Sequence, residues 1–205
     1  IGVYLDLYGE LEEPGFSIDS QLPASLVQDK FEAQKPFGRE KQILFGDTHV
    51  HTTYSTDAFL WSLPILNGEG PHPISDACDF ARFCANLDFW VSTDHAEALT
   101  PRKWKSIKEA VRNCNKPANI TEPDLVTFLG YEWTQVGNTA DEHYGHKNVM
   151  FLDIEEENVP LRAIGAGGIA TTGMRDGLPS QSKQLRPAAL LDPENRHRYF
   201  NFIAF

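Results

Sequence analysis

Histidines and carboxylates of this chain gather at the ends of short apolar runs. The first run, residues 42–51, ends in Asp47-Thr-His49-Val-His51. Residues two apart on a strand point to the same face, roughly 6.5–7 Å apart, so Asp47, His49 and His51 would share one face. Two imidazoles placed in this way can bind one ion, with each nitrogen about 2.0–2.1 Å from the metal. A His-x-His alone also suits a solvated strand end, so this run by itself is a weak indication.

The following runs repeat the arrangement. Residues 87–92 lead into Thr-Asp-His95-Ala-Glu97, residues 125–131 lead into Glu132, and His146 comes directly before the run 147–152. The carboxyl ends of strands form the site face of parallel α/β sheets and barrels, so these side chains should meet. Histidine and carboxylate ligands without cysteine suit Zn, Mn or Fe. Together the runs predict a metal site.

Two amphipathic segments separate the first three runs and would position them. Residues 73–87 and 101–114 carry apolar side chains at helical spacing, and Pro101 suits a first helical turn. Strand–helix–strand–helix–strand predicts an α/β fold with parallel strands and right-handed crossovers. Residues 1–42, with three prolines and many charges, are predicted to form an irregular N-terminal arm. The weakly patterned residues 155–193 are typical of a functional loop or lid.

Composition excludes several classes of protein. The 205 residues include 18 Lys+Arg and 29 Asp+Glu, a net charge of −11, so a nucleic-acid partner is not expected. No run of about 18 apolar residues occurs, so no membrane span is expected. Cys78, Cys84 and Cys114 are interpreted as small packing residues or free thiols, and they do not decide the compartment. The missing initiator methionine weakly favours a processed, exported or periplasmic protein, and a homo-oligomer stays open.

Four motifs together resemble the PHP (polymerase and histidinol phosphatase) superfamily of metal-dependent phosphoesterases, and most of all a poorly characterised branch of predicted hydrolases. The motifs are Phe45-Gly-Asp-Thr-His-Val-His-Thr-Thr-Tyr-Ser-Thr-Asp-Ala58, Ser92-Thr-Asp-His-Ala-Glu97, Gly130-Tyr-Glu-Trp-Thr134 and His146-Lys-Asn-Val149. They follow the order of the family over residues 43–152. The first motif departs from the family where Thr56 separates Ser55 from Asp57.

The resemblance implies a distorted (β/α)7 barrel with two to three divalent ions at the carboxyl ends of its strands. Carried over by motif, the metal ligands are His49 and His51 for the first ion, Glu132 bridging the first and second, His146 for the second, and Asp57 and His95 for the third. The family completes its site with a later His and an Asp-x-His motif, whereas only His197 follows His146 here. Residues 43–205 are therefore expected to be the N-terminal portion of such a barrel, and the apolar residues 199–205 suggest the same truncation.

The predicted function is that of a metal-dependent hydrolase, first of all a phosphoesterase acting on a small phosphorylated or ester substrate. A metal-bound hydroxide would attack phosphorus in line, with Glu132 as the bridge and with Asp47 and Glu97 orienting the imidazoles. One alternative is hydrolysis of a non-phosphate ester or an amide at the same centre. Another is a non-catalytic scaffold subunit that retains the fold. Residues left open between a site role and a structural or surface role are Arg82, Lys147, Arg175, His72, His143, Tyr54 and Trp133.

Overall fold

The computed structural model describes residues 15–34, 43–70, 72–116, 123–135, 139–165 and 202–204. The strands are β1 (Gly46–Val50), β2 (Phe89–Ser92), β3 (Val126–Gln135), β4 (Gly145–Phe151) and β5 (Phe202–Ala204). The α-helices are α1 (Ala24–Gln34), α2 (Thr56–Ser62), α3 (Ile74–Asp79) and α4 (Pro101–Asn115). A π-helical turn, η3 (Phe80–Cys84), continues α3, and the 3-10 turns are η2 (Pro64–Leu66), η4 (Ala96–Ala98) and η5 (Ala140–Glu142).

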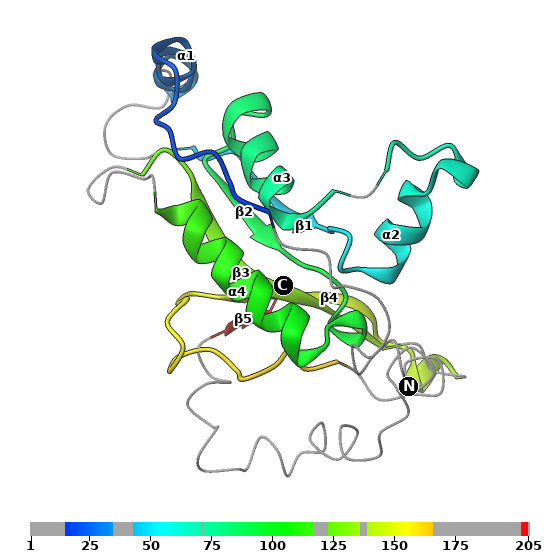
Figure 1. Cartoon of the computed structure of the whole chain (residues 1–205). Coiled ribbons are helices and arrows are strands. Elements are labelled where there is room, and N and C mark those ends of the chain that lie inside the picture. The colour runs from blue at the N-terminus through cyan, green and yellow to red at the C-terminus, as the bar shows by residue number, and fades with distance from the viewer. Residues whose placement is uncertain are drawn as a thin grey trace.

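The strands form one curled, mixed sheet in the order β1-β2-β3-β4-β5, and β1 to β4 make a half-barrel (Figure 1). Strand β2 lies parallel to both β1 and β3, as predicted. Strand β4 runs antiparallel to β3, unlike the uniformly parallel order of a (β/α)7 barrel. Only residues 136–144 separate these two strands, and a parallel return needs a crossover of a dozen residues or more. The α/β fold and barrel-like curl are confirmed, and the complete barrel stays a prediction.

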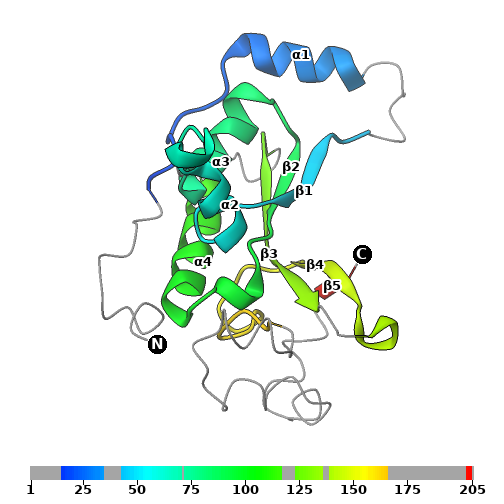
Figure 2. The ribbon, with the colours of Figure 1, turned by 90° about the vertical axis from the view of Figure 1, so that its right-hand side faces the viewer.

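Helices α3 and α4 lie on the same side of the sheet, at the strands that carry the candidate ligands (Figure 2). The predicted helix over residues 101–114 is confirmed: Thr100 caps α4 by accepting a hydrogen bond from the Lys103 N–H, and Pro101 occupies its first turn. Trp104 on α4 is fully buried, and its ring lies edge-on to Tyr131 of β3, with 5.8 Å between the centroids. The core therefore fixes α4 against the strand that carries Glu132.

The N-terminal arm contains a helix that the sequence pattern did not predict. Helix α1 follows Pro23 and is built largely from Ala, Gln, Lys and Glu, which favour helix without an apolar stripe. Val27 and Phe31 are more than half exposed, so the helix lacks the buried face on which periodicity depends. Lys30 attaches α1 to the sheet by donating to the carbonyls of Leu87 and Asp124, at 2.6 Å each.

Two cysteines form a disulfide bond, which corrects their interpretation as packing residues or free thiols. Cys78 on α3 is bonded to Cys114 on α4, 36 residues away, with their Cα atoms 6.0 Å apart. Spacing along the sequence does not reveal this pairing, because the two cysteines lie on different helices of the same layer. Cys84 is a free, exposed thiol. Disulfides persist in oxidising compartments, so the bond is compatible with export.

Arg82 is fully buried, so it neither reaches a phosphate nor lies on the surface. Its guanidinium donates to the carbonyl of Cys114 at 2.7 Å and pairs with Asp124 at 3.2 Å. Arg82 therefore connects η3 to the end of α4.

Lys147 is exposed and donates to the carbonyl of Tyr144. Arg175 and most of the stretch 155–193 lie outside the described residues. Among the described helices, none has the length and apolar character needed to cross a membrane.

Candidate metal centre

Six predicted metal ligands meet at one end of the half-barrel. His49 and His51 lie at the end of β1, Asp57 lies in the first turn of α2, and His95 follows β2. A single β-bridge between His95 and Glu132 carries the pairing of β2 and β3 past Ser92. His146 on β4 lies opposite Thr134 in the β3–β4 ladder, and Thr134 is two residues after Glu132 on β3. The predicted convergence of strand ends is therefore confirmed for His49, His51, Asp57, His95, Glu132 and His146.

Glu132 lies at the centre of this group. Its side chain is 1% exposed, and both carboxylate oxygens face imidazole nitrogens. Four imidazoles surround it, with N···O distances of 3.5 Å for His49, 3.1 Å for His51, 3.1 Å for His95 and 2.8 Å for His146. Burial alone would raise the pKa of Glu132, but the contact with His51 and the charges of His95 and His146 outweigh it and lower that pKa.

Asp57 is a second carboxylate of the centre, and it contacts two of these imidazoles, those of His51 and His95. His51 contacts Asp57 through Nδ1 at 3.4 Å and Glu132 through Nε2 at 3.1 Å. His95 contacts Asp57 through Nε2 at 3.2 Å. Burial acts to lower the pKa of His51, but its contacts with Glu132 and Asp57 prevail and raise it. The two rings thus link the two carboxylates.

Three ligand triads result, each with its donor atoms within 4.8 Å of one another: His49–His51–Glu132, His51–Asp57–His95 and His95–Glu132–His146. A neutral imidazole offers one acceptor nitrogen, so His51 and His95 can each serve one ion at a time. A carboxylate has two oxygens and can bridge two ions. The six residues can therefore complete two triads at once, those that share Glu132.

The surroundings of this buried carboxylate provide the test of whether a metal fits. An imidazole nitrogen that lies against a carboxylate oxygen needs a proton or a cation between the two atoms, and a divalent cation would supply that positive charge. The donors are oxygen and imidazole nitrogen, the set that Zn, Mn and Fe accept. The residues present therefore fit a metal centre.

A network of buried polar groups, which the sequence analysis did not single out, holds the ligands. Asp94 is fully buried and accepts hydrogen bonds from the N–H and the hydroxyl of Thr52, at 2.6 and 2.9 Å. Burial raises the pKa of Asp94, and these hydrogen bonds oppose the rise. Ser55 accepts from the His95 N–H at 2.8 Å. Their place in the sequence could have indicated this role, because Thr52 and Ser55 lie in the motif of His49 and His51, and Asp94 lies in the motif of His95.

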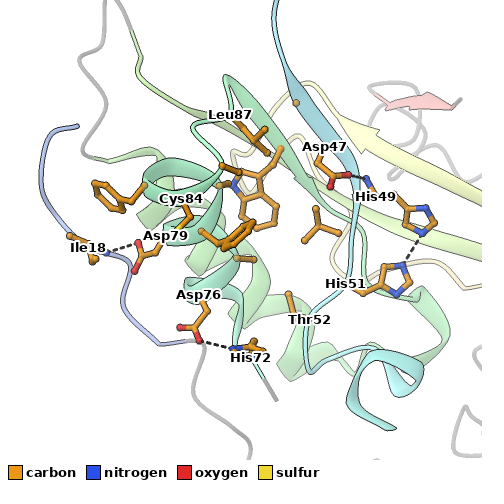
Figure 3. A pocket seen from close by; sticks show the side chains of 18 of the residues that line it. Ile18, Asp47, His49, His51, Thr52, His72, Asp76, Asp79, Cys84 and Leu87 are labelled. Carbon is orange, nitrogen blue, oxygen red and sulfur yellow. Dashed lines mark hydrogen bonds and ion pairs between the residues drawn. The ribbon is translucent and has the colours of Figure 1, made fainter. Parts of the chain in front are cut away.

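Glu97 and Asp47, which were expected to orient imidazole rings, each accept a hydrogen bond from a backbone N–H group. Glu97 is buried, and its carboxylate accepts from the Thr134 N–H at 3.3 Å. The hydroxyl of Thr134 lies 2.9 Å from Nδ1 of His95 and 3.1 Å from Nδ1 of His146, so Glu97 can influence two ligands through Thr134. Asp47 is exposed and accepts from the backbone N–H of His49 at 2.9 Å (Figure 3). Their catalytic roles stay predictions.

The remaining predicted residues lie away from the triads. His72 is exposed and contacts Asp76 at 3.2 Å, and His143 is exposed after η5. Tyr54 belongs to the core, and Trp133 packs against it.

Two hollows adjoin the centre. One, of about 940 Å³, lies beside β1 and η3 and is lined in part by His49 and His51. The other, of about 160 Å³, is lined by Thr48, His49, Glu132, His146, Asn148 and Met150.

Comparison with known families gives a match over the first part of the centre. The model of a protein family of unknown function, DUF3604, matches residues 38–101. The matched segment, about a third of the chain, carries His49, His51, Asp57 and His95, but ends before Glu132 and His146. No curated protein and no solved structure matches the chain. The family match therefore covers the part of the centre that lies between β1 and η4, and it names no activity.

Proposed function

We propose that the chain is a metal-dependent hydrolase that cleaves small phosphoesters at a centre of two divalent ions bridged by Glu132. The observation that carries this proposal is the Glu132 carboxylate, which is buried and has four imidazole nitrogens within 3.5 Å. The resemblance of the four motifs to PHP phosphoesterases supports the same reading.

The chain's own residues would perform three tasks at this centre. Glu132 would hold one ion together with His49 and His51 and a second ion together with His95 and His146. Asp57, whose pKa is lowered by the Ala58 N–H and by the charge of His95 against the effect of burial, stays ionised and faces both shared imidazoles. When bound, the ions would activate water and stabilise the charge that develops on the phosphoryl oxygens.

The surroundings leave room for a substrate but add no positive charge of their own. The smaller hollow is lined by residues without Lys or Arg, so a phosphoryl group placed there would rely on the ions for charge neutralisation. The larger hollow beside β1 has apolar side chains from η3 and adjoins His49 and His51. A small ester with an apolar substituent would fit both features.

The test is hydrolysis by the whole chain after loading with Zn²⁺ or Mn²⁺. p-Nitrophenyl phosphate and bis(p-nitrophenyl) phosphate probe monoesters and diesters, and p-nitrophenyl acetate and a p-nitroanilide probe the alternatives. We expect phosphoester turnover that a chelator abolishes and that Glu132→Gln lowers at least 100-fold. Glu109→Gln, an exposed glutamate paired with Lys105, is the matched control and should retain full turnover. Turnover of only the acetate or anilide would replace the phosphoesterase proposal with the alternative.

A further inference from the structure

The part of β1 that carries His49 is irregular. In the β1–β2 ladder Asp47 pairs with Trp90 and Val50 with Ser92, so the register shifts between Asp47 and Val50. Thr48 and His49 fall within this shift. Beyond it, β1 is well held, because the N–H of Val50 donates to the Thr93 hydroxyl at 2.8 Å and its carbonyl accepts from the Thr93 N–H at 2.9 Å. Strand β2 therefore fixes the His51 end of the motif more firmly than the His49 end.

Asn148 on β4 holds the irregular part from across the curled sheet. Its side-chain amide donates to the carbonyl of Thr48 at 2.9 Å, between residues 100 positions apart. Strands β2 and β3 separate β1 from β4 in the sheet order, so this bond spans the mouth of the half-barrel. Asn148 lies opposite Glu132 in the β3–β4 ladder and two residues from His146. One side chain thus connects the His49 segment to the strands that carry Glu132 and His146.

The other end of the Asn148 amide lacks a partner. Its Oδ1 is buried without a hydrogen bond. Asn148 and Glu132 line the hollow of about 160 Å³ together with His49 and His146. The hollow thus combines an unpartnered amide oxygen with a buried carboxylate, and it favours a cation or a hydrogen-bond donor, because a buried acceptor without a partner is destabilising.

We propose that Asn148 is a positioning residue of the candidate metal centre. Its N–H fixes Thr48, and with it His49, opposite Glu132 and His146, while its Oδ1 accepts a hydrogen bond from the group that fills the hollow. The inference rests on the proposed metal centre but not on the phosphoesterase activity. It predicts that Asn148 matters for the triads that contain His49 or His146 and not for the triad His51–Asp57–His95.

The experiment measures metal binding by the whole chain, with Zn²⁺ as the probe and a chelator as competitor. Asn148→Ala removes both contacts, and Asn148→Asp keeps an oxygen towards the hollow but cannot donate to the Thr48 carbonyl. We expect both variants to bind the ions of the Glu132 triads about 10–100-fold more weakly, the usual effect of losing a group that orients a ligand. The thermal midpoint of unfolding without metal should stay near that of the wild type.

Asn158→Ala is the matched control, because Asn158 also donates its amide to one acceptor, Asp153, at 2.6 Å, but lies outside the triads. Wild-type Zn²⁺ affinity in either Asn148 variant, or an equal loss in Asn158→Ala, would overturn the proposal, as would a wild-type chain that binds no Zn²⁺. If the wild-type chain binds Zn²⁺ with an affinity that depends on Asn148 but leaves every phosphoester intact, only the proposed activity would be overturned.

Discussion

Removing the disulfide should lower the stability of the chain by an amount that follows from its position. The bond between Cys78 and Cys114 closes a loop with a sequence separation of 36 residues. The chain-entropy relation gives about 3.8 kcal/mol for a loop of this length at 25 °C. For a chain of this size each kcal/mol lowers the melting temperature by about 2–4 °C, so the expected loss is about 8–15 °C.

The comparison uses oxidised wild type, reduced wild type and the double variant Cys78→Ala/Cys114→Ala. Alanine is preferred to serine because both sites are 1% exposed, where a new hydroxyl would be buried. Reduced wild type keeps the Cys114 sulfur that accepts from the Thr127 hydroxyl at 3.0 Å, so it separates the cross-link from that contact. Cys84→Ala is the control, because this thiol is exposed and free, and its melting temperature should match that of the wild type.

Thiol titration of the denatured chain decides whether the bond exists. The sequence has three cysteines, so one reactive thiol is expected before reduction and three after it. Three reactive thiols before reduction would refute the pairing. One reactive thiol together with an unchanged melting temperature after reduction would refute the entropic reasoning, since the cross-link would then constrain little in the unfolded chain.

The remaining predictions concern the triads and one ion pair. Asp57→Asn removes the acidic ligand from His51–Asp57–His95 only, so elemental analysis should find the two ions of the Glu132 triads retained, whereas Glu132→Gln should lose them; equal metal contents in the two variants would contradict the partition. Glu156→Gln leaves the buried Lys108 ammonium without its carboxylate and should cost about 1 kcal/mol in urea unfolding at pH 7, the low end of the usual range because Glu156 is half exposed. Its contact with Lys108 lowers the pKa of Glu156 below its ordinary value of 4.5, so this stabilisation is complete above pH 5 and should vanish as the pH falls through the lowered pKa. A gap between wild type and variant that persists in acid would contradict the assignment.

Local pattern was sufficient for the elements that position the site. The run that ends at Glu132 and the helix with Trp104, Ile107 and Val111 each bury one face against the same core, which makes their periodicity clear. The run that ends at His51 is exposed from residue 43 to residue 49, so its prediction depended on strand-like composition and on the His-x-His spacing. Helix α1 escaped prediction because it buries no such face. The antiparallel direction of β4 escaped because it depends on how long the connection from β3 is, which apolar periodicity does not encode.

Four ligands could be predicted from their place near a strand end: His49 and His51 at the end of β1, His95 after β2 and His146 near the start of β4. Glu132, inside β3, and Asp57, in α2, could be predicted from the motifs that contain them. The residues that support the ligands could not be predicted. Histidine and glutamate are conspicuous by residue type, but the role of Thr134 and Asn148 depends on which strand lies across the sheet. The contact between Asn148 and Thr48 joins residues 100 positions apart and requires the curl of the half-barrel. The disulfide escaped for the same reason, since its partner lies on a neighbouring helix.

At this centre, protons on the imidazoles and a bound metal ion would both serve to compensate the negative charge of Glu132. Without ions, the buried charge of Glu132 is offset only by the imidazoles around it, and its pKa is low because those rings supply positive charge. His51, whose pKa is raised by the same carboxylates, is the ring best suited to keep a proton there. Its contribution to stability is present at low pH and is lost as the pH rises through the raised pKa, which leaves the Glu132 charge less compensated. A divalent ion restores that compensation where protons leave, and because the ligands come from β1, α2, the end of β2, β3 and β4, it also joins these elements. The metal is thus expected to stabilise the fold most at the pH values where a hydrolytic centre needs its ligands deprotonated.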